Sequence, residues 1–153
     1  MRMMTNGIVA LALASVGMVP MGHGVQGSST GEEPAVRKAL GYYLEGHATG
    51  QGAAFAKAFH PDAKLFFNRD GKFSQVTSAE YIARAAGKPA DDEAQRKRRI
   101  DFVDVTGDAA VAKITLEYPG VTFTDYMSLV KVDGEWKIVN KTFYANRQAT
   151  KSE

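Results

Sequence analysis

The stretch TDYMSLVKVDGEWKIVNKTFY, residues 124–144, predicts two antiparallel strands joined by a tight turn. Asp133-Gly134 separates two runs of alternating polar and apolar residues, and this arrangement is the strongest short-range signal of a β-hairpin. Strict alternation outward from the turn places Asp125 and Asn140 on the same face as the apolar core residues. We therefore expect an inward-facing carboxylate at Asp125, unless a bulge shifts the register by one residue.

The elements upstream of this hairpin predict an α+β domain. Helical spacing and helix breakers indicate helices within residues 32–50, 51–60 and 78–87, and a Thr77–Glu80 capping box opens the third. Alternation and turn signals indicate strands over residues 64–68, 72–76, 99–105, 109–118, 122–132 and 135–146. Because helices come early and strands late, we expect three N-terminal helices packed on a curved, mainly antiparallel sheet.

Residues 1–27 have the order of regions found in a secretory signal peptide. A positively charged start precedes the apolar run GIVALALASVGMVP, and a small-residue tract follows it. The run is shorter than the roughly 20 residues of a membrane-spanning helix. We expect cleavage near Gly27, a periplasmic or secreted location, no stable membrane insertion, and a single domain over residues 28–153. The alternative is a buried N-terminal helix or a disordered tail.

The composition argues against several kinds of functional site. The chain of 153 residues has 19 Lys and Arg, 17 Asp and Glu, and no Cys. The near balance of charge argues against a general polyanion binder, and the lack of Cys excludes disulfides and Cys-based metal sites. The histidines are not at metal-ligand spacing, and there is no glycine-rich phosphate loop. We expect no metal, no cofactor and no nucleic-acid partner.

The stretches RIDFVDVTGDAAVAKI and FTDYMSLVKVDGEWKIVNKTF, within residues 99–144, resemble the putative lumazine-binding branch of the NTF2-like (SnoaL-like) superfamily. The upstream segments YYLEG, FHPDA and VTSAEYI fit the same family. The resemblance implies a cone-shaped domain, with a bent sheet wrapped around a long helix and a pocket open at one end. The superfamily includes isomerases, dehydrating enzymes, ligand carriers and protein-binding modules, so the fold by itself leaves the function open.

Asp125 is the first candidate for chemistry. An inward carboxyl group among apolar neighbours is desolvated, and it can act as a general base or, once protonated, as a hydrogen-bond donor. In an enzyme of the isomerase or dehydratase kind, Tyr43 or His60 would be its partner. The alternative is a structural carboxylate paired with a cation such as Lys141. Strict alternation places Lys141 on the opposite face, so that pairing needs a bulge.

A small-molecule-binding domain is the first expectation for the whole chain. We expect a flat or ring-containing organic ligand in a largely apolar pocket. The predicted wall consists of Phe55, Phe59, Phe66, Tyr81, Tyr118, Phe123, Met127, Trp136 and Asn140. The alternatives are the isomerase- or dehydratase-like enzyme and a homodimeric interaction module without an active pocket. The outer face of the hairpin is moderately apolar, which favours a homodimer formed through the sheet.

Overall fold

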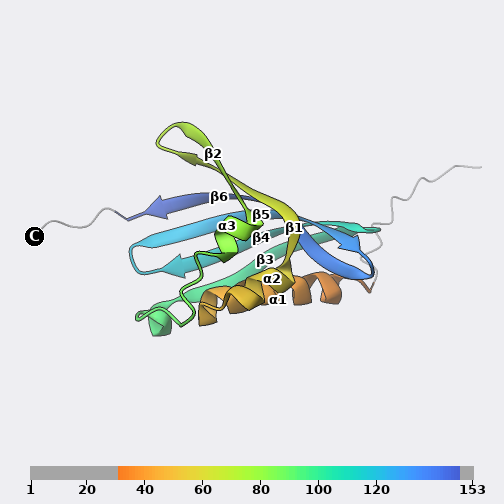
Figure 1. Cartoon of the computed structure of the whole chain (residues 1–153), viewed down its shortest axis with the longest axis horizontal. Helices are drawn as coiled ribbons and strands as arrows, with labels where there is room; N and C mark the ends of the chain where they lie inside the picture. Colours follow the sequence, from red (N-terminus) through yellow and green to blue (C-terminus); the bar gives the residue numbers. More distant parts are fainter. Residues whose placement is uncertain (1–30, 149–153) are drawn as a thin grey trace, which may run out of the picture.

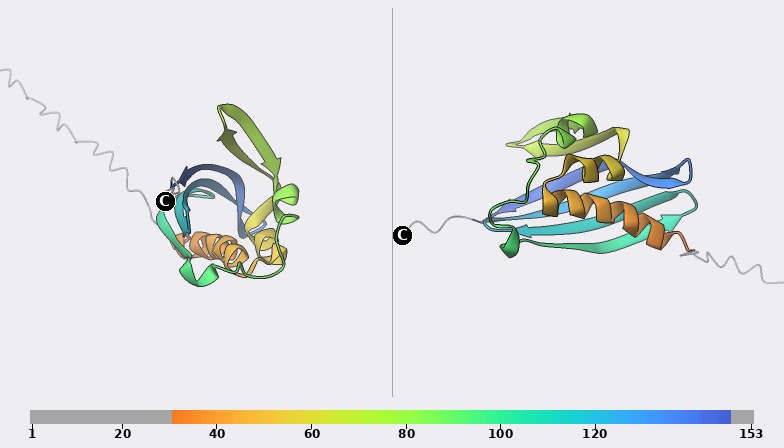
Figure 2. Two further views of the ribbon diagram at one scale, coloured as in Figure 1. Left: turned by 90° about the vertical axis from the view of Figure 1, so that its left-hand side faces the viewer. Right: turned by 60° about the horizontal axis from the view of Figure 1, so that its bottom comes forward.

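A six-stranded sheet bends around one long helix (Figures 1 and 2). The computed structural model describes residues 31–148, so the predicted signal peptide lies outside the described residues. In chain order the elements are α1 (Glu33–Thr49), α2 (Gly52–Ala58), β1 (Phe59–Arg69), β2 (Lys72–Thr77), α3 (Ser78–Ile82), the short 3₁₀ helix η1 (Glu93–Gln95), β3 (Lys97–Thr106), β4 (Ala109–Tyr118), β5 (Val121–Val132) and β6 (Glu135–Arg147). The predicted α+β order is confirmed.

The strand order in the sheet is β2-β1-β6-β5-β4-β3. β1 runs parallel to β6, and every other neighbouring pair is antiparallel. Figure 2 shows the sheet curling around α1, while the β1–β2 hairpin projects away from the curve. This is the expected cone with a mainly antiparallel sheet. None of the helices between residues 31 and 148 combines the length and the apolarity of a membrane span.

Helix α1 lies inside the curve because one stripe of its surface is apolar. Val36, Leu40 and Tyr43 recur at helical spacing, and all three are fully buried. Burying a large apolar side chain contributes about 1.5–3 kcal/mol, so this stripe holds the helix against the sheet. Gly50 ends the helix in the left-handed conformation, with φ of 70°, and its N–H donates to the Gly46 carbonyl oxygen at 2.9 Å.

Two helices are shorter than the sequence predicts. α2 ends at Ala58, because the next residue, Phe59, already pairs with Ile138 in the parallel β1–β6 ladder. α3 has the predicted Thr77–Glu80 capping box, but it ends at Ile82 rather than near residue 87. The N–H of Ala85 donates to the Ile82 carbonyl oxygen at 3.0 Å, which is the tighter spacing of a 3₁₀ turn. The chain then leaves the helix as a long loop.

The β5–β6 hairpin follows the predicted register near its turn and departs from it further on. Asp133 and Gly134 both have positive φ, 50° and 83°, as a type I′ turn requires. Leu129 pairs with Ile138 as predicted. The register then shifts, so that Asn140 pairs with Ser128 of β5. Val139 is therefore an extra residue in β6. This is a β-bulge, and it reverses the faces of the residues that follow it.

Candidate functional site

Asp125, Tyr43 and Lys141 form a buried hydrogen-bonded triad inside the cone. The Tyr43 hydroxyl donates to Asp125 Oδ2 at 2.5 Å and accepts a hydrogen bond from Lys141 Nζ at 2.5 Å. Lys141 Nζ also lies 3.0 Å from Asp125 Oδ2. Asp125 and Tyr43 have no exposed surface, and Lys141 is 4% exposed. The inward position predicted for Asp125 is therefore confirmed.

Three elements bring these side chains together. α1 supplies Tyr43 from its apolar stripe, β5 supplies Asp125 and β6 supplies Lys141. Because of the bulge at Val139, Met127 of β5 lies opposite Lys141 instead of Asn140. The bulge thus makes the ion pair that strict alternation excluded, and the prediction of an inward Asn140 is wrong.

The sequence carries a signal for this bulge. In β6 the buried residues Trp136 and Ile138 have even numbers, whereas Lys141 and Phe143 have odd numbers. Phe143 contacts the interior ring of Phe123, with 6.3 Å between centroids. An aromatic residue of the wrong parity downstream of a regular strand indicates an extra residue between the two sets.

Burial controls the protonation of the triad. Burial raises the pKa of the Tyr43 hydroxyl well above its usual value, and the Asp125 carboxylate adds to this effect, so Tyr43 remains a donor. Burial lowers the pKa of the Lys141 ammonium, and the Asp125 carboxylate opposes that shift. Lys141 therefore gives up its proton more readily than an exposed lysine does. Within residues 31–148 Asp125 Oδ1 has no hydrogen-bond partner, so the carboxyl group has an unused acceptor.

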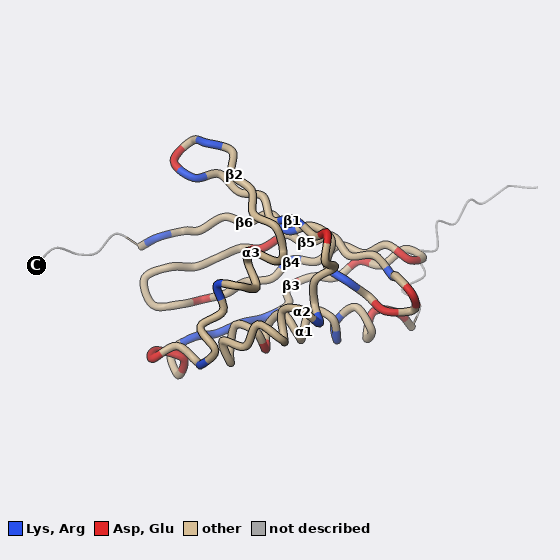
Figure 3. The backbone as a smooth tube through the Cα atoms, viewed as in Figure 1, with Lys and Arg blue, Asp and Glu red and all other residues tan. Residues whose placement is uncertain are grey.

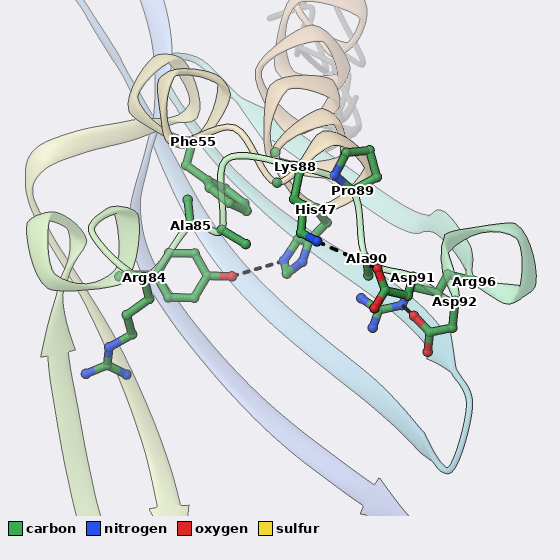
Figure 4. Close-up of a pocket in the computed structure, with 14 residues that line it drawn as sticks. His47, Phe55, Arg84, Ala85, Lys88, Pro89, Ala90, Asp91, Asp92 and Arg96 are labelled. Carbon is green, nitrogen blue, oxygen red and sulfur yellow. Dashed lines mark hydrogen bonds and ion pairs between the residues drawn. The ribbon is translucent and has the colours of Figure 1, made fainter.

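A cavity of about 670 Å³ lies at the end of α1, between α2, α3 and the loop before β3 (Figure 4). Its volume is within the range of about 300–1,000 Å³ that is usual for small-molecule sites. The wall comes from the end of α1, from α2 and α3, and from the loop before β3. The lining residues are Gly46, His47, Gly50, Phe55, Tyr81, Arg84, Ala85, Ala86, Lys88, Pro89, Ala90, Asp91, Asp92 and Arg96. Of the predicted wall residues, Phe55 and Tyr81 line this cavity.

His47 is the central polar group of this wall. Its Nε2 atom lies 3.0 Å from the Tyr81 hydroxyl, and its ring packs edge-on against Phe55, with 5.1 Å between centroids (Figure 4). Burial lowers the pKa of His47 well below its usual value, and the positive charges of Lys141 and Arg98 add to this effect. His47 is therefore neutral near pH 7, although the C-terminal end of a helix by itself favours the cation. A neutral imidazole can accept a proton.

The rings of His47 and Tyr81 connect the cavity to the triad. The His47 and Tyr43 ring centroids are 4.7 Å apart, and Lys141 Nζ lies 5.5 Å from the centroid of the Tyr81 ring. None of the three triad residues lines the cavity. The site therefore has two layers, with the His47–Tyr81 pair facing the cavity and the charged triad behind it. Burial raises the pKa of the Tyr81 hydroxyl, so Tyr81 stays protonated as a donor.

The charged rim of the cavity is mostly paired. Arg96 Nε lies 2.7 Å from Asp92 Oδ1, and Lys88 Nζ lies 3.8 Å from Asp91 Oδ1. Arg84 extends away from the His47 ring (Figure 4). In the part of the chain that the structure describes, no three His, Asp or Glu side chains gather as a metal site would require.

Arg98 links the loop before β3 to the end of α1 by hydrogen bonds. Its guanidinium donates to both carboxylate oxygens of Glu93, at 2.6 and 2.7 Å, and to the His47 carbonyl oxygen at 3.2 Å. Such a two-point contact holds the loop in one orientation beside the cavity. The contact also keeps a positive charge near the His47 ring.

Three predicted wall residues lie in the aromatic interior behind the cavity. Phe59 packs between Tyr43 and Tyr81, with 5.9 and 5.7 Å between ring centroids. Tyr118 packs on Phe123, with 5.8 Å between centroids. These rings support the site, and they do not form the cavity wall.

Other predicted site residues lie elsewhere. Phe66 stacks on the exposed Phe73 of the β1–β2 hairpin. His60 accepts a hydrogen bond from the Asp62 N–H at 3.2 Å, and it does not line the cavity. Met127 is a core residue with 2% of its surface exposed, and Trp136 lines a separate cavity. Sequence reasoning did not place His47 in the site, and it offered Lys141 only as a structural partner of Asp125 whose pairing needs a bulge.

The comparisons with known proteins agree with this architecture. The family described as Putative lumazine-binding matches residues 31–144. An NTF2-like protein of unknown function from Shewanella baltica is 26% identical, with a TM-score of 0.69 over 76% of this chain and 95% of that one. An NTF2-like protein of unknown function from Methylobacillus flagellatus is 27% identical, with a TM-score of 0.67 over 78% of this chain and 97% of that one.

One curated relative has a named activity. Aldolase FrzH from a Cladobotryum species is 28% identical over 105 residues, which are 67% of this chain and 82% of the relative.

Proposed function

The chain belongs to the putative lumazine-binding family of NTF2-like proteins, and on that premise we propose that it binds a small, flat, ring-containing molecule in the cavity beside His47. The observation that carries this proposal is the cavity of about 670 Å³ whose wall combines Phe55 with the hydrogen-bonded His47–Tyr81 pair. Ligand sites typically pair an apolar wall with a few convergent polar groups in this way.

The residues of the cavity wall indicate which part of the ligand would contact each of them. The Phe55 ring offers an apolar surface for a planar ring, and aromatic contacts of this kind contribute about 0.5–1.5 kcal/mol beyond burial. The neutral His47 and the protonated Tyr81 offer one acceptor and one donor between them. A heterocycle with a carbonyl group next to an N–H group matches that pair, and lumazine has such an edge.

A titration with lumazine tests the proposal directly. We expect saturable binding by lumazine fluorescence, weakened about fivefold in Tyr81→Phe, because a hydrogen bond is worth about 1 kcal/mol. Arg84→Gln is the matched control, since Arg84 lines the cavity but extends away from His47 (Figure 4). Native mass spectrometry of protein purified from its own cells asks which molecule travels with it. No saturable binding of lumazine together with no co-purifying molecule would overturn the proposal.

A second candidate is an enzyme that moves a proton next to a carbonyl group. The relative named as an aldolase favours it, as does a neutral histidine at the cavity wall with a charged triad behind it. In this reading His47 removes the proton and the Tyr81 hydroxyl stabilises the oxyanion. Asp125, which the sequence predicts as a general base or acid, does not line the cavity. Its role is to hold Tyr43 and Lys141 in place.

Deuterium exchange can detect this activity without knowledge of the natural substrate. In D₂O we expect the methyl protons of pyruvate or acetone to exchange faster with the protein than in buffer. Loss of a general base costs about 10²–10⁴ in rate, so His47→Gln should return the exchange to the buffer rate. Exchange that equals the buffer rate with the unaltered protein would exclude this candidate and leave ligand binding.

Export and homodimer formation remain predictions. The outer face of the sheet exposes Phe102, Val111 and Tyr126 around a shallow hollow of about 280 Å³, which supports self-association through this face. Cell fractionation would test export. Light scattering of the protein and of Tyr126→Glu would test the dimer, which should dissociate in the variant.

A further inference from the structure

A second cavity, of about 360 Å³, lies between the first half of α1, the end of α2 and the start of β6. It shares no lining residue with the cavity beside His47. Its walls are Ala35, Lys38, Ala39, Tyr42, Lys57, Gly134, Glu135, Trp136 and Lys137. We name this cavity the lysine groove. Figure 3 shows basic positions of α1 and α2 close to the first part of β6.

The lysine groove carries an excess of positive charge. Three lysines line it against one carboxylate, that of Glu135. Lys137 is already engaged, because its Nζ atom lies 2.9 Å from Glu135 Oε2 and donates to the Lys57 carbonyl oxygen at 3.1 Å. Lys38 and Lys57 pair with no carboxylate within residues 31–148. Two ammonium groups therefore have no ion-pair partner in that part of the chain, although Lys38 is close enough to Glu135 to help lower the pKa of that carboxyl group.

The lysine groove also has aromatic side chains in its wall, and one of them, Trp136, is held by a hydrogen bond. Trp136 is 4% exposed, and its indole N–H donates to Glu32 Oε2 at 2.9 Å. Lys131 holds the same Glu32 carboxylate at 2.8 Å. On the other side, Lys57 Nζ lies 5.5 Å from the centroid of the Tyr42 ring. A flat ligand ring would thus meet aromatic side chains in a groove that three lysines also line.

We propose that the lysine groove is a second binding site, for a small aromatic molecule that carries a carboxylate or phosphate group. The volume suits a small ligand, because it is at the lower end of the usual range of about 300–1,000 Å³. The ammonium groups of Lys38 and Lys57 hold the anion, and Tyr42 and Trp136 flank the ring. The formal net charge of the whole chain is only +2, so the local excess recruits a compact anion and not an extended polyanion.

Trp136 makes this proposal easy to test, because it is the only tryptophan in the chain. Trp136 lines the lysine groove and not the cavity beside His47, so its fluorescence is a direct reporter of binding in the groove. The probe is para-nitrophenyl phosphate, whose nitrophenyl ring quenches a nearby indole. The neutral comparison is para-nitrobenzyl alcohol, which has the same quenching group without the anion. Free N-acetyltryptophanamide gives the collisional quenching to subtract.

We expect saturable quenching by the phosphate probe that weakens as salt is added. Lys38→Gln and Lys57→Gln should each weaken binding about fivefold, the effect of one charge contact of about 1 kcal/mol in water. Both side chains are exposed, so neither change disturbs the core. Lys72→Gln is the matched control, since Lys72 is exposed on the β1–β2 hairpin, outside the lysine groove.

Three results would overturn the proposal. One is quenching by the phosphate probe that never saturates above the N-acetyltryptophanamide control. The second is equal binding of the neutral alcohol, and the third is unchanged binding in the Lys38→Gln/Lys57→Gln double variant. Lumazine binding beside His47 can succeed or fail independently of these results, because the two cavities share no residue.

Discussion

Lys141 Nζ and Asp125 Oδ2 lie 3.0 Å apart inside the cone, although strict alternation from the hairpin turn would place the two side chains on opposite faces. The extra residue Val139 resolves the conflict. A buried ion pair of this kind seldom adds net stability, because both groups lose their hydration. Its effect here is to place a charge behind the His47–Tyr81 wall.

Breaking the pair from one side should destabilise the protein strongly. Lys141→Met leaves the Asp125 carboxylate buried and uncompensated, which costs about 3–5 kcal/mol of unfolding free energy. The Asp125→Leu/Lys141→Met double variant should lose much less than the sum of the two single changes. Urea unfolding gives the unfolding free energy of the two single variants and the double variant. Lys97→Met, at the exposed start of β3, is the control. A loss below about 1 kcal/mol in Lys141→Met would contradict a charged pair.

Deleting the bulge residue should be tolerated better than deleting a residue in register. Without Val139, Asn140 would follow Ile138 directly and still pair with Ser128, so Lys141 would stay inward. Deleting Thr142 instead turns Phe143 outward and should cost at least about 2 kcal/mol more in urea unfolding. Equal losses from the two deletions would show that Val139 is not the extra residue.

Stability should fall as the pH drops through the ordinary histidine range. The pKa of His47 is lowered in the folded protein by burial and by neighbouring cations, so below about pH 6.5 the unfolded chain binds a proton that the folded chain does not. The contribution of His47 is thus present above that pH and decreases below it, by up to about 1.4 kcal/mol per pH unit.

Urea unfolding between mildly acidic and neutral pH checks this dependence. His47→Gln should make the unfolding free energy depend less steeply on pH. His60→Gln changes a histidine outside the cavity and should leave that dependence unchanged. A His47→Gln variant with the slope of the unaltered protein would contradict the assignment.

Filling the space at Gly46 should close part of the cavity. A Cβ atom at Gly46 would lie 2.6 Å from the Phe55 ring, so Gly46→Ala must move that ring. We expect a loss of about 1–3 kcal/mol in stability and weaker lumazine binding. Gly41→Ala in the same helix has open space around its Cβ, and it should stabilise the protein by about 0.5–1 kcal/mol. Unfolding and titration of the two variants separate overpacking from helix propensity.

Much of the fold could be predicted from local chemistry. The Asp133-Gly134 turn, the Thr77–Glu80 cap and the apolar stripe through Leu40 and Tyr43 each act within a few residues of the chain. The inward position of Asp125 followed from the same reasoning, because strand alternation is a local rule until a bulge interrupts it. Helix ends were less predictable, since α2 stops at Ala58 only because the next residue pairs with a strand far along the chain.

The sequence alone therefore determined the order of elements, the hairpin and the inward carboxylate, because hydrophobic periodicity and turn geometry are properties of neighbouring residues. Only the tertiary structure decided that Lys141 meets Asp125 and that His47 meets Tyr81. Those contacts join residues 16 and 34 positions apart, and they depend on a bulge in β6 and on the position of α3 beside the end of α1. The break in parity along β6 indicates the bulge, but no periodic pattern gives the distance between the groups, since the packing of the whole cone fixes it.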